Sequence, residues 1–258
     1  MNWPLALDWT LFHNMTDSNR DKLFSKPLGK VPKFVFDGSV VDVFPDMIQR
    51  SVPGYQTIIN HTGELADRFV EENSYCYDLG CSLGASTLAI RERIENRNAT
   101  IYAVDNSQAM LDKLATILEG QPASTATKLI KGDICDIQIT NASLVILNFT
   151  LQFVPLARRA ELISNIYEGL NANGCLIISE KLHFEPEPLN QLLSELHHQF
   201  KRDQGYSDLE ISQKRDAIDK VLIPETLDTH IERLKQCGFK SASPWFQCYN
   251  FGSLIAIK

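Results

Sequence analysis

The sequence has no hydrophobic run of the roughly 20 residues that a membrane-spanning helix needs. It has no excess of basic residues either, since 25 Lys and Arg stand against 32 Asp and Glu and the formal net charge is −7. A grip on nucleic-acid phosphates comes mainly from clustered Lys and Arg. We therefore expect a small-molecule substrate, with no membrane contact and no direct binding of nucleic acid.

Paired cysteines and histidines with metal-ligand spacing are also missing. The six cysteines form no CxxC pair and show no regular spacing, and several lie in predicted strands, where Cys behaves as a small apolar residue. His197 and His198 are adjacent, so they point to different sides of a helix. These features predict a chain of the reducing cytoplasm, with no disulfide framework and no metal site.

The N-terminal stretch MNWPLALDWTLFHNMTDSNRD has a short apolar patch, but it carries Asp8 and no basic leading segment, so it is a poor secretory signal. We expect residues 1–19 to be a flexible extension, with Met15 as an alternative start. Residues 20–258 are enough to bury the core of one large α/β domain with an N-terminal helical cap.

Strand and helix signals alternate from about residue 74. Helical spacing is found at 84–94, 107–120 and 155–170. Between these segments lie short apolar runs that predict strands, at 74–80, 100–106, 127–133, 143–150 and 175–181. The alternation predicts a doubly wound, mostly parallel sheet with helices on both faces.

The alternation breaks after Lys181. Two consecutive amphipathic segments predict a helical insertion at about 182–223, and a further helix at 224–238 ends at Gly238. The last 18 residues read as two strands joined around Asn250, and such a hairpin requires one antiparallel strand. A seven-stranded Rossmann-like sheet closed in this way is typical of class I S-adenosylmethionine (SAM) methyltransferases, whereas NAD-binding domains normally lack the hairpin.

The turn in YDLGCSLGAS, residues 77–86, is the first candidate for a ligand site. As the dinucleotide pattern G-x-G-x-x-G it matches at only one of three positions. As the SAM pattern acid-x-G-x-G-x-G it matches at Asp78, Gly80 and Gly84, with Ser82 in place of the middle glycine. SAM has no phosphate, so a serine can stand there and add a hydrogen bond. Small residues in this turn could equally serve packing alone.

Asp105 ends the second predicted strand. In this fold an acid at that position accepts hydrogen bonds from both ribose hydroxyls. The alternative is a helix cap for the segment beginning at Ser107, which Asn106 or Ser107 could provide equally well.

The third and fourth predicted strands also end in polar residues. Asp133 can accept a hydrogen bond from the adenine amino group while Ile134 packs on the ring, and Asn148 would lie beside the reactive end of the ligand. One such residue is commonplace, but successive parallel strands that each end in one describe a site. Together these residues predict SAM binding.

Six longer segments are more specific: FPDMIQRSVPGY (44–55), YDLGCSLGAST (77–87), NASLVILNFTLQF (141–153), LHHQFKR (196–202), GYSDLEISQKR (205–215) and WFQCYNFGS (245–253). They closely resemble the carboxy-S-adenosyl-L-methionine synthase (CmoA) family, from about Arg20 to the C-terminus. Ser82 is what this family has in the middle of the loop.

The resemblance implies a transferase that converts SAM and prephenate to carboxy-SAM and phenylpyruvate. It also implies a homodimer, and hand-over of the carboxymethyl group, through a separate tRNA carboxymethyltransferase, to a wobble uridine. The arginine that corresponds to Arg215 contacts the added carboxylate and comes from the other subunit. Tyr55 and Arg215 are the implied catalytic residues, and the implied ligand site is Tyr55, Gly80, Cys81, Ser82, Asp105, Asn106, Asp133, Ile134, Asn148 and Arg215.

Other interpretations stay open. The chain could be a conventional SAM methyltransferase acting on a small molecule, or a non-catalytic SAM-binding subunit. Arg215 would then belong to a solvated helix face, and Tyr55 would be a turn residue packed on the core. Two sets are undecided between a site or dimer contact and an ordinary surface or core role: His197, His198, Lys201 and Arg202, and Trp245 and Phe246.

Overall fold

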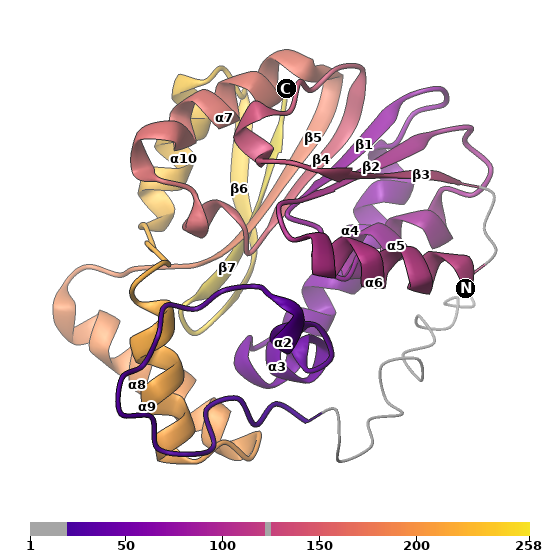
Figure 1. Cartoon of the computed structure of the whole chain (residues 1–258). Helices are drawn as coiled ribbons and strands as arrows, with labels where there is room; N and C mark the ends of the chain where they lie inside the picture. The colour runs from indigo at the N-terminus through magenta and orange to yellow at the C-terminus, as the bar shows by residue number, and fades with distance from the viewer. Residues whose placement is uncertain (1–19, 122–124) are drawn as a thin grey trace, which may run out of the picture.

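The computed structural model describes residues 20–121 and 125–258, so the predicted extension at 1–19 lies outside the described residues. Its centre is a seven-stranded sheet in the order β3-β2-β1-β4-β5-β7-β6 (Figure 1). β7 runs antiparallel to both of its neighbours, and the other neighbouring pairs are parallel. The predicted parallel sheet with a C-terminal hairpin is confirmed. The strands are β1 (Tyr75–Leu79), β2 (Thr100–Asp105), β3 (Ala126–Lys131), β4 (Ala142–Asn148), β5 (Leu170–Lys181), β6 (Ser241–Cys248) and β7 (Phe251–Ile257).

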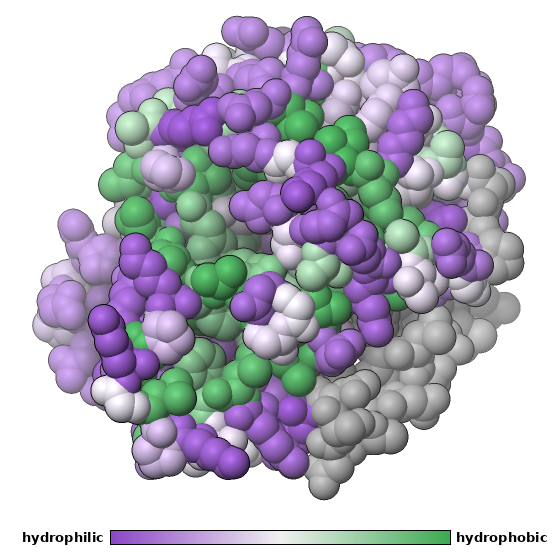
Figure 2. Space-filling model, in the orientation of Figure 1, coloured by the Kyte–Doolittle hydropathy of each residue, from purple (hydrophilic) through white to green (hydrophobic). Residues whose placement is uncertain are grey.

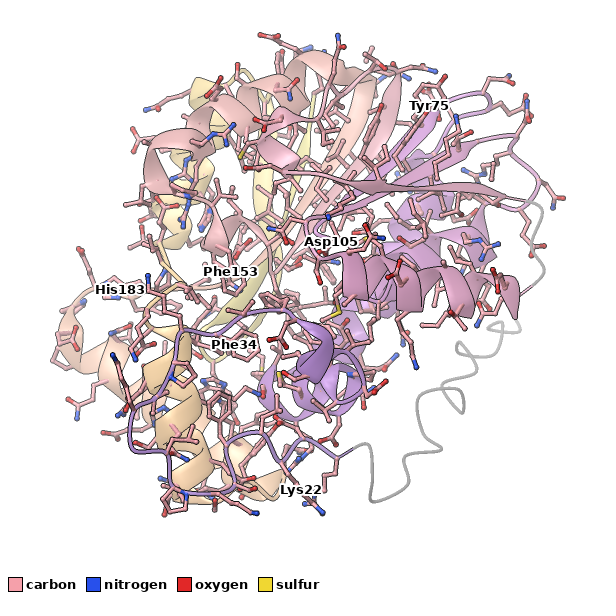
Figure 3. All side chains as sticks on the ribbon, in the orientation of Figure 1. Lys22, Phe34, Tyr75, Asp105, Phe153 and His183 are labelled. Atoms are coloured by element: carbon pink, nitrogen blue, oxygen red, sulfur yellow. The ribbon has the colours of Figure 1, made fainter. Side chains whose placement is uncertain are left out.

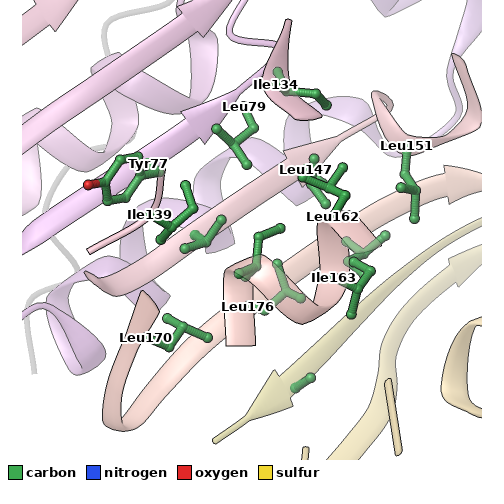
Figure 4. Close-up of a cluster of buried hydrophobic side chains, with 14 of the residues drawn as sticks. Tyr77, Leu79, Ile134, Ile139, Leu147, Leu151, Leu162, Ile163, Leu170 and Leu176 are labelled. Carbon is green, nitrogen blue, oxygen red and sulfur yellow. The ribbon is translucent and has the colours of Figure 1, made fainter. Parts of the chain in front are cut away.

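Helices cover both faces of the sheet because its central strands are apolar on both sides. One face packs against α4 (Tyr55–Phe69), α5 (Ala85–Arg93) and α6 (Gln108–Glu119). The other packs against α7 (Leu156–Gly169) and α10 (Leu227–Gln236). Figure 4 shows this second core, in which side chains of α7 lie against those of β4 and β5.

A separate group of helices lies together below the sheet in the view of Figure 1. This cap consists of residues 20–37, α2 (Gly38–Val41), α3 (Phe44–Ser51), α8 (Glu187–Asp203) and α9 (Asp208–Ile218). Residues 20–37, α2, α3 and α9 share a hydrophobic cluster that includes Phe24, Phe34, Met47 and Ala217. α8 is joined to α3 by the hydrogen bond between His197 Nε2 and the Ser51 carbonyl (2.8 Å). The cap therefore joins the chain before β1 to the chain between β5 and β6, and α8 and α9 are the helices of the predicted insertion.

Several element boundaries differ from the prediction by a few residues, and two of these differences are described here. β3 ends at Lys131, because the Gly132 amide donates to the Asp105 carbonyl (3.0 Å) and the Asp133 carboxylate accepts from Cys135 N (2.9 Å), which starts the short helix η2 (Ile134–Asp136). β5 begins at Leu170, five residues before the predicted start of that strand at 175. Leu170 and Cys175 pair with Ala142 and Leu144, so residues 171–174 form a bulge in the strand.

Among the described residues, no helix is long and apolar enough to cross a membrane. All six cysteines are free thiols.

Candidate active site

A cavity of about 1010 Å³ lies between the cap and the carboxyl ends of the parallel strands. Hydrophobic residues gather around a hollow in the face seen in Figure 2. Figure 3 labels Asp105 at the end of β2, and Phe34 of the cap and Phe153 of the short helix η3 (Leu151–Phe153), all three of which line the cavity. The structure brings every predicted site residue to this one cavity: Tyr55, Gly80, Cys81, Ser82, Asp105, Asn106, Asp133, Ile134, Asn148 and Arg215.

The turn after β1 is tied to the end of β2. The amides of Gly80 and Cys81 both donate to the Val104 carbonyl (2.8 and 2.9 Å), and the Ser82 amide donates to the Asp105 carboxylate (2.8 Å). Gly80 has φ +82°, and a Cβ there would lie 2.4 Å from the Thr150 side chain. Glycine is therefore required at this position by both backbone conformation and space.

Asp105 is buried, and its two carboxylate oxygens accept from the amides of Ser82 and Ser107 (both 2.8 Å). The cap of α6 is Ser107, whose hydroxyl accepts from Met110 N, so Asp105 does not have that role. Burial raises the pKa of the Asp105 carboxyl. Each oxygen keeps a second lone pair, which leaves the carboxylate able to accept from two hydroxyls of a ligand.

The residues after β3 form another part of the cavity wall. Ile134 is buried, while Asp133 is exposed and pairs with Arg158 of α7 at 3.1 Å. The carboxylate of Asp133 also accepts from Cys135 N, as described above. A flat apolar surface beside an acceptor is what an adenine ring with its amino group requires.

Asn148 ends β4, and its amide is fixed by neighbours on both sides. The amide nitrogen donates to Ser86 Oγ (2.9 Å), and the oxygen accepts from Ser179 Oγ (2.6 Å). Ser179 in turn contacts Ser253 of β7 at 2.8 Å. These contacts fix the orientation of the amide of Asn148, which lines the cavity.

Tyr55 begins α4 and lies near Phe149, with ring centroids 6.0 Å apart. Burial, and secondarily the charge of Asp78, raise the pKa of its phenol. Its hydroxyl makes no hydrogen bond with another described residue. It is therefore a neutral donor available to a ligand.

The helices of the cap supply a cationic wall, whose charges belong to lysine and arginine because burial lowers the pKa of both His197 and His198. His197, His198 and Lys201 of α8 line the cavity, whereas Arg202 does not and instead pairs with Asp208 at 2.8 Å. Arg215 of α9 lies on the rim of its own chain's cavity. Its side chain is 49% exposed, and among the described residues it is held only by a 3.4 Å contact with Asp216. The guanidinium is thus free to bind an anion at the mouth.

Comparisons with known proteins agree with this geometry. A family model described as "Methyltransferase domain" matches residues 77–174. Human N-acetylserotonin methyltransferase in complex with SAM is a structural neighbour with a TM-score of 0.55 and 14% identity, over 86% of this chain and 55% of that one. An O-methyltransferase family protein from Burkholderia thailandensis has a TM-score of 0.60 and 14% identity, over 86% and 60%. Likeness at this level confirms the class I methyltransferase fold.

Sequence relatives are more specific. A carboxy-S-adenosyl-L-methionine synthase from Actinobacillus pleuropneumoniae is 52% identical over 240 residues, covering 93% of this chain and 100% of that protein. The protein of the same name from Salmonella paratyphi C is 51% identical over 241 residues, covering 93% and 98%. The chain belongs to the carboxy-S-adenosyl-L-methionine synthase family. The predicted family is confirmed.

The sequence analysis did not single out Lys181, a charged residue of this carboxy-SAM synthase cavity. Lys181 is the last residue of β5, the same position at the strand edge that marked Asp105 and Asn148, so the same rule could have found it. Lys214 of α9 also lines the cavity, and its ammonium is paired with Asp21 (3.2 Å) and Ser51 Oγ (2.9 Å).

The undecided aromatic residues lie outside the cavity of this carboxy-SAM synthase family member. Phe246 packs on Gly54, where a Cβ would lie 2.1 Å from its ring, and thereby supports the start of α4. Trp245 contacts the ring of His61, with centroids 5.5 Å apart. Within residues 20–121 and 125–258, no three His, Cys, Asp or Glu side chains are grouped as metal ligands.

Proposed function

We propose that this protein synthesises carboxy-SAM from SAM and prephenate and releases phenylpyruvate. One observation carries the proposal. The residues predicted to bind SAM, at the strand ends, line the same cavity as the cationic wall on α8 and α9. Identity of 52% to a protein named for carboxy-SAM synthesis supports it. SAM is a substrate here, and no residue of the proposal needs a metal.

The reaction balances without an added oxidant or reductant. Prephenate loses carbon dioxide and hydroxide, which makes its ring aromatic and leaves phenylpyruvate. The hydroxide takes a proton from the SAM methyl group, whose acidity comes from the adjacent sulfonium, and forms water and an ylide. The ylide carbon then bonds to the carbon of carbon dioxide. Because the leaving hydroxide is the base, the proposal requires no histidine or paired carboxylate.

Individual residues have separate tasks in this proposal. Asp105 accepts from the ribose hydroxyls, Asp133 from the adenine amino group, and Ile134 packs on the ring. Tyr55 and Arg215 bind the new carboxylate, and the guanidinium of Arg215 can do so with two parallel hydrogen bonds. The loop Gly80–Ser82, together with Asn106 and Asn148, surrounds the methionine part and the reactive methyl group. Exclusion of water by the cap keeps carbon dioxide beside the ylide.

Incubation of the purified protein with SAM, with and without prephenate, followed by mass spectrometry, tests the proposal. A species heavier than SAM by one carbon dioxide, formed only with prephenate, is the expected result. The methyltransferase-domain match and the O-methyltransferase neighbours favour one second candidate, methyl transfer to a small molecule. That function would give S-adenosylhomocysteine once a methyl acceptor is added, with or without prephenate. Bound SAM that never changes would indicate a non-catalytic subunit.

The proposal includes a homodimer in the cytoplasm that passes carboxy-SAM to a tRNA carboxymethyltransferase for the wobble uridine. Three leucines of α8 at positions i, i+3 and i+7 are exposed on one helix face, which supports self-association: Leu189, Leu192 and Leu196. The half-exposed rim position of Arg215 suits a group that serves either of two adjoining cavities. The acidic net charge supports a separate protein as the tRNA-binding component.

A further inference from the structure

Two lysines of the cavity wall have no partner among the described residues. Lys201 of α8 is only 7% exposed, yet its ammonium makes no hydrogen bond or ion pair with another described residue. Lys181, half-buried at the end of β5, is in the same situation. Buried ammonium groups are costly unless they are paired. An unpaired buried lysine that lines a cavity is therefore a candidate group for binding an anion.

The neighbouring cations differ in this respect. Lys214 is paired with Asp21, and Arg215 lies half-exposed at the rim. Only two acids line the same part of the wall, Glu187 and Asp219, and neither forms an ion pair with a described lysine. Asp219 acts on both lysines from a distance, and Asp21 on Lys201, but no described acid forms an ion pair with either one. The inner part of the cationic wall thus carries positive charge without an acid in contact. Burial, and then the positive charges of Lys214 and Lys181, lower the pKa of Lys201 to about 7.

We propose that Lys181 and Lys201 form a subsite for the carboxylate that the carboxyl donor keeps. This inference rests on the proposed function. Prephenate has two carboxylates, of which one leaves as neutral carbon dioxide and the other remains on phenylpyruvate. A cation paired with the departing carboxylate would stabilise the substrate more than the transition state and slow the reaction. Binding at the retained carboxylate holds the donor without that penalty, and leaves Arg215 for the transferred group.

Binding of phenylpyruvate to the SAM-loaded protein, measured by titration calorimetry, tests the subsite directly, because this product carries only the retained carboxylate. Lys201→Met and Lys181→Met should each weaken its binding by at least about tenfold. Lys201→Arg should keep most of the affinity, since it keeps the charge. Arg202→Met is the matched control on the same helix turn, outside the cavity, and should bind phenylpyruvate as the wild type does.

Kinetics with prephenate distinguish this role from a structural one. Lys201→Met should raise the prephenate KM by at least about tenfold, with the SAM KM unchanged and a much smaller change in kcat. Unchanged phenylpyruvate binding and prephenate KM in both methionine variants would overturn the subsite. Failure of the proposed function would be seen elsewhere, as the absence of carboxy-SAM from the wild-type incubation.

Discussion

Asp105 holds the turn after β1 and, in the proposed function, also accepts hydrogen bonds from the ribose of the ligand. Its carboxylate fixes the Ser82 amide and the start of the chain toward α6, and it retains lone pairs that face the cavity. The sequence placed an acid at this strand end but could not decide between an N-cap of α6 and a ligand contact. The structure excludes the N-cap role, because Ser107 is the N-cap of α6.

Asp105→Ala should weaken SAM and carboxy-SAM alike, by at least about tenfold, because both ligands share the ribose and because the loop at Ser82 loses its anchor. Titration calorimetry with each ligand measures this. Asp112→Ala, on the exposed side of α6, is the control and should change neither affinity. A selective loss of one ligand would contradict the assignment of Asp105 to the ribose.

Arg215→Lys should lose about tenfold or more in carboxy-SAM affinity while SAM affinity and the melting temperature stay the same. A lysine keeps the charge but cannot form two parallel hydrogen bonds to a carboxylate. Competition between carboxy-SAM and labelled SAM gives the ratio of affinities directly. Arg202→Lys, paired with Asp208 away from the cavity, should leave that ratio unchanged. If Arg215→Lys did the same, the arginine would have no part in the site.

Among the structural elements, the turn between β1 and α5 is tightly constrained, because Gly80 has a positive φ and a close neighbour in Thr150. Its conformation was predictable in part, because the small residues in YDLGCSLGAS require a tight turn at a strand end. What the sequence could not reveal is the neighbour of each glycine. Thr150, which comes from the chain just after β4, fills the space beside Gly80 and links two strand ends that are far apart in sequence.

Gly80→Ala should lower the free energy of unfolding by about 1–3 kcal/mol, because φ is +82° and the new methyl group meets Thr150 at 2.4 Å. It should also weaken SAM binding, since the loop must move. Chemical denaturation and SAM titration measure the two effects. Gly120→Ala, at the end of α6 with no atom nearer than 3.6 Å, should be neutral or slightly stabilising. Equal stability of the two variants would show that the turn is less constrained than its geometry indicates.

At the scale of the whole molecule, the sheet and the side on which its site lies were predictable from the sequence. The order of the apolar runs predicts the sheet, and the polar residues at the strand ends predict the edge at which the candidate site lies. The final hairpin is predicted by two extended segments joined around Asn250. The shape of the cap was not predictable, because it depends on contacts such as that between Phe34 and the carbonyl of Ala217 (3.3 Å). Lys201 is buried and the adjacent Arg202 is exposed, and this difference also depends on how the cap packs.

The cap also determines how stability responds to pH. Lys201 has a pKa of about 7 in the folded protein and an ordinary value of 10.5, and it faces Lys181, Lys214, Asp21 and Asp219. Between these values the unfolded chain binds more protons than the folded chain, so the free energy of unfolding rises with pH across that window.

Lys201→Met removes this contribution. Without ligand, it should be more stable than the wild type at pH 7, by an amount on the order of 2 kcal/mol, and this advantage should shrink toward pH 10. Denaturant titrations at both pH values measure it. Identical pH dependence of stability in the two proteins would mean that folding does not lower the pKa of Lys201.

The fate of the ring carboxylate of prephenate shows directly whether this protein carboxylates SAM. Prephenate isotopically labelled at that carboxylate is incubated with SAM and the purified protein, and both products are analysed by mass spectrometry. Carboxylation of the SAM methyl carbon predicts that the label appears in carboxy-SAM and is absent from phenylpyruvate. Formation of unlabelled carboxy-SAM, or of S-adenosylhomocysteine alone, would contradict it.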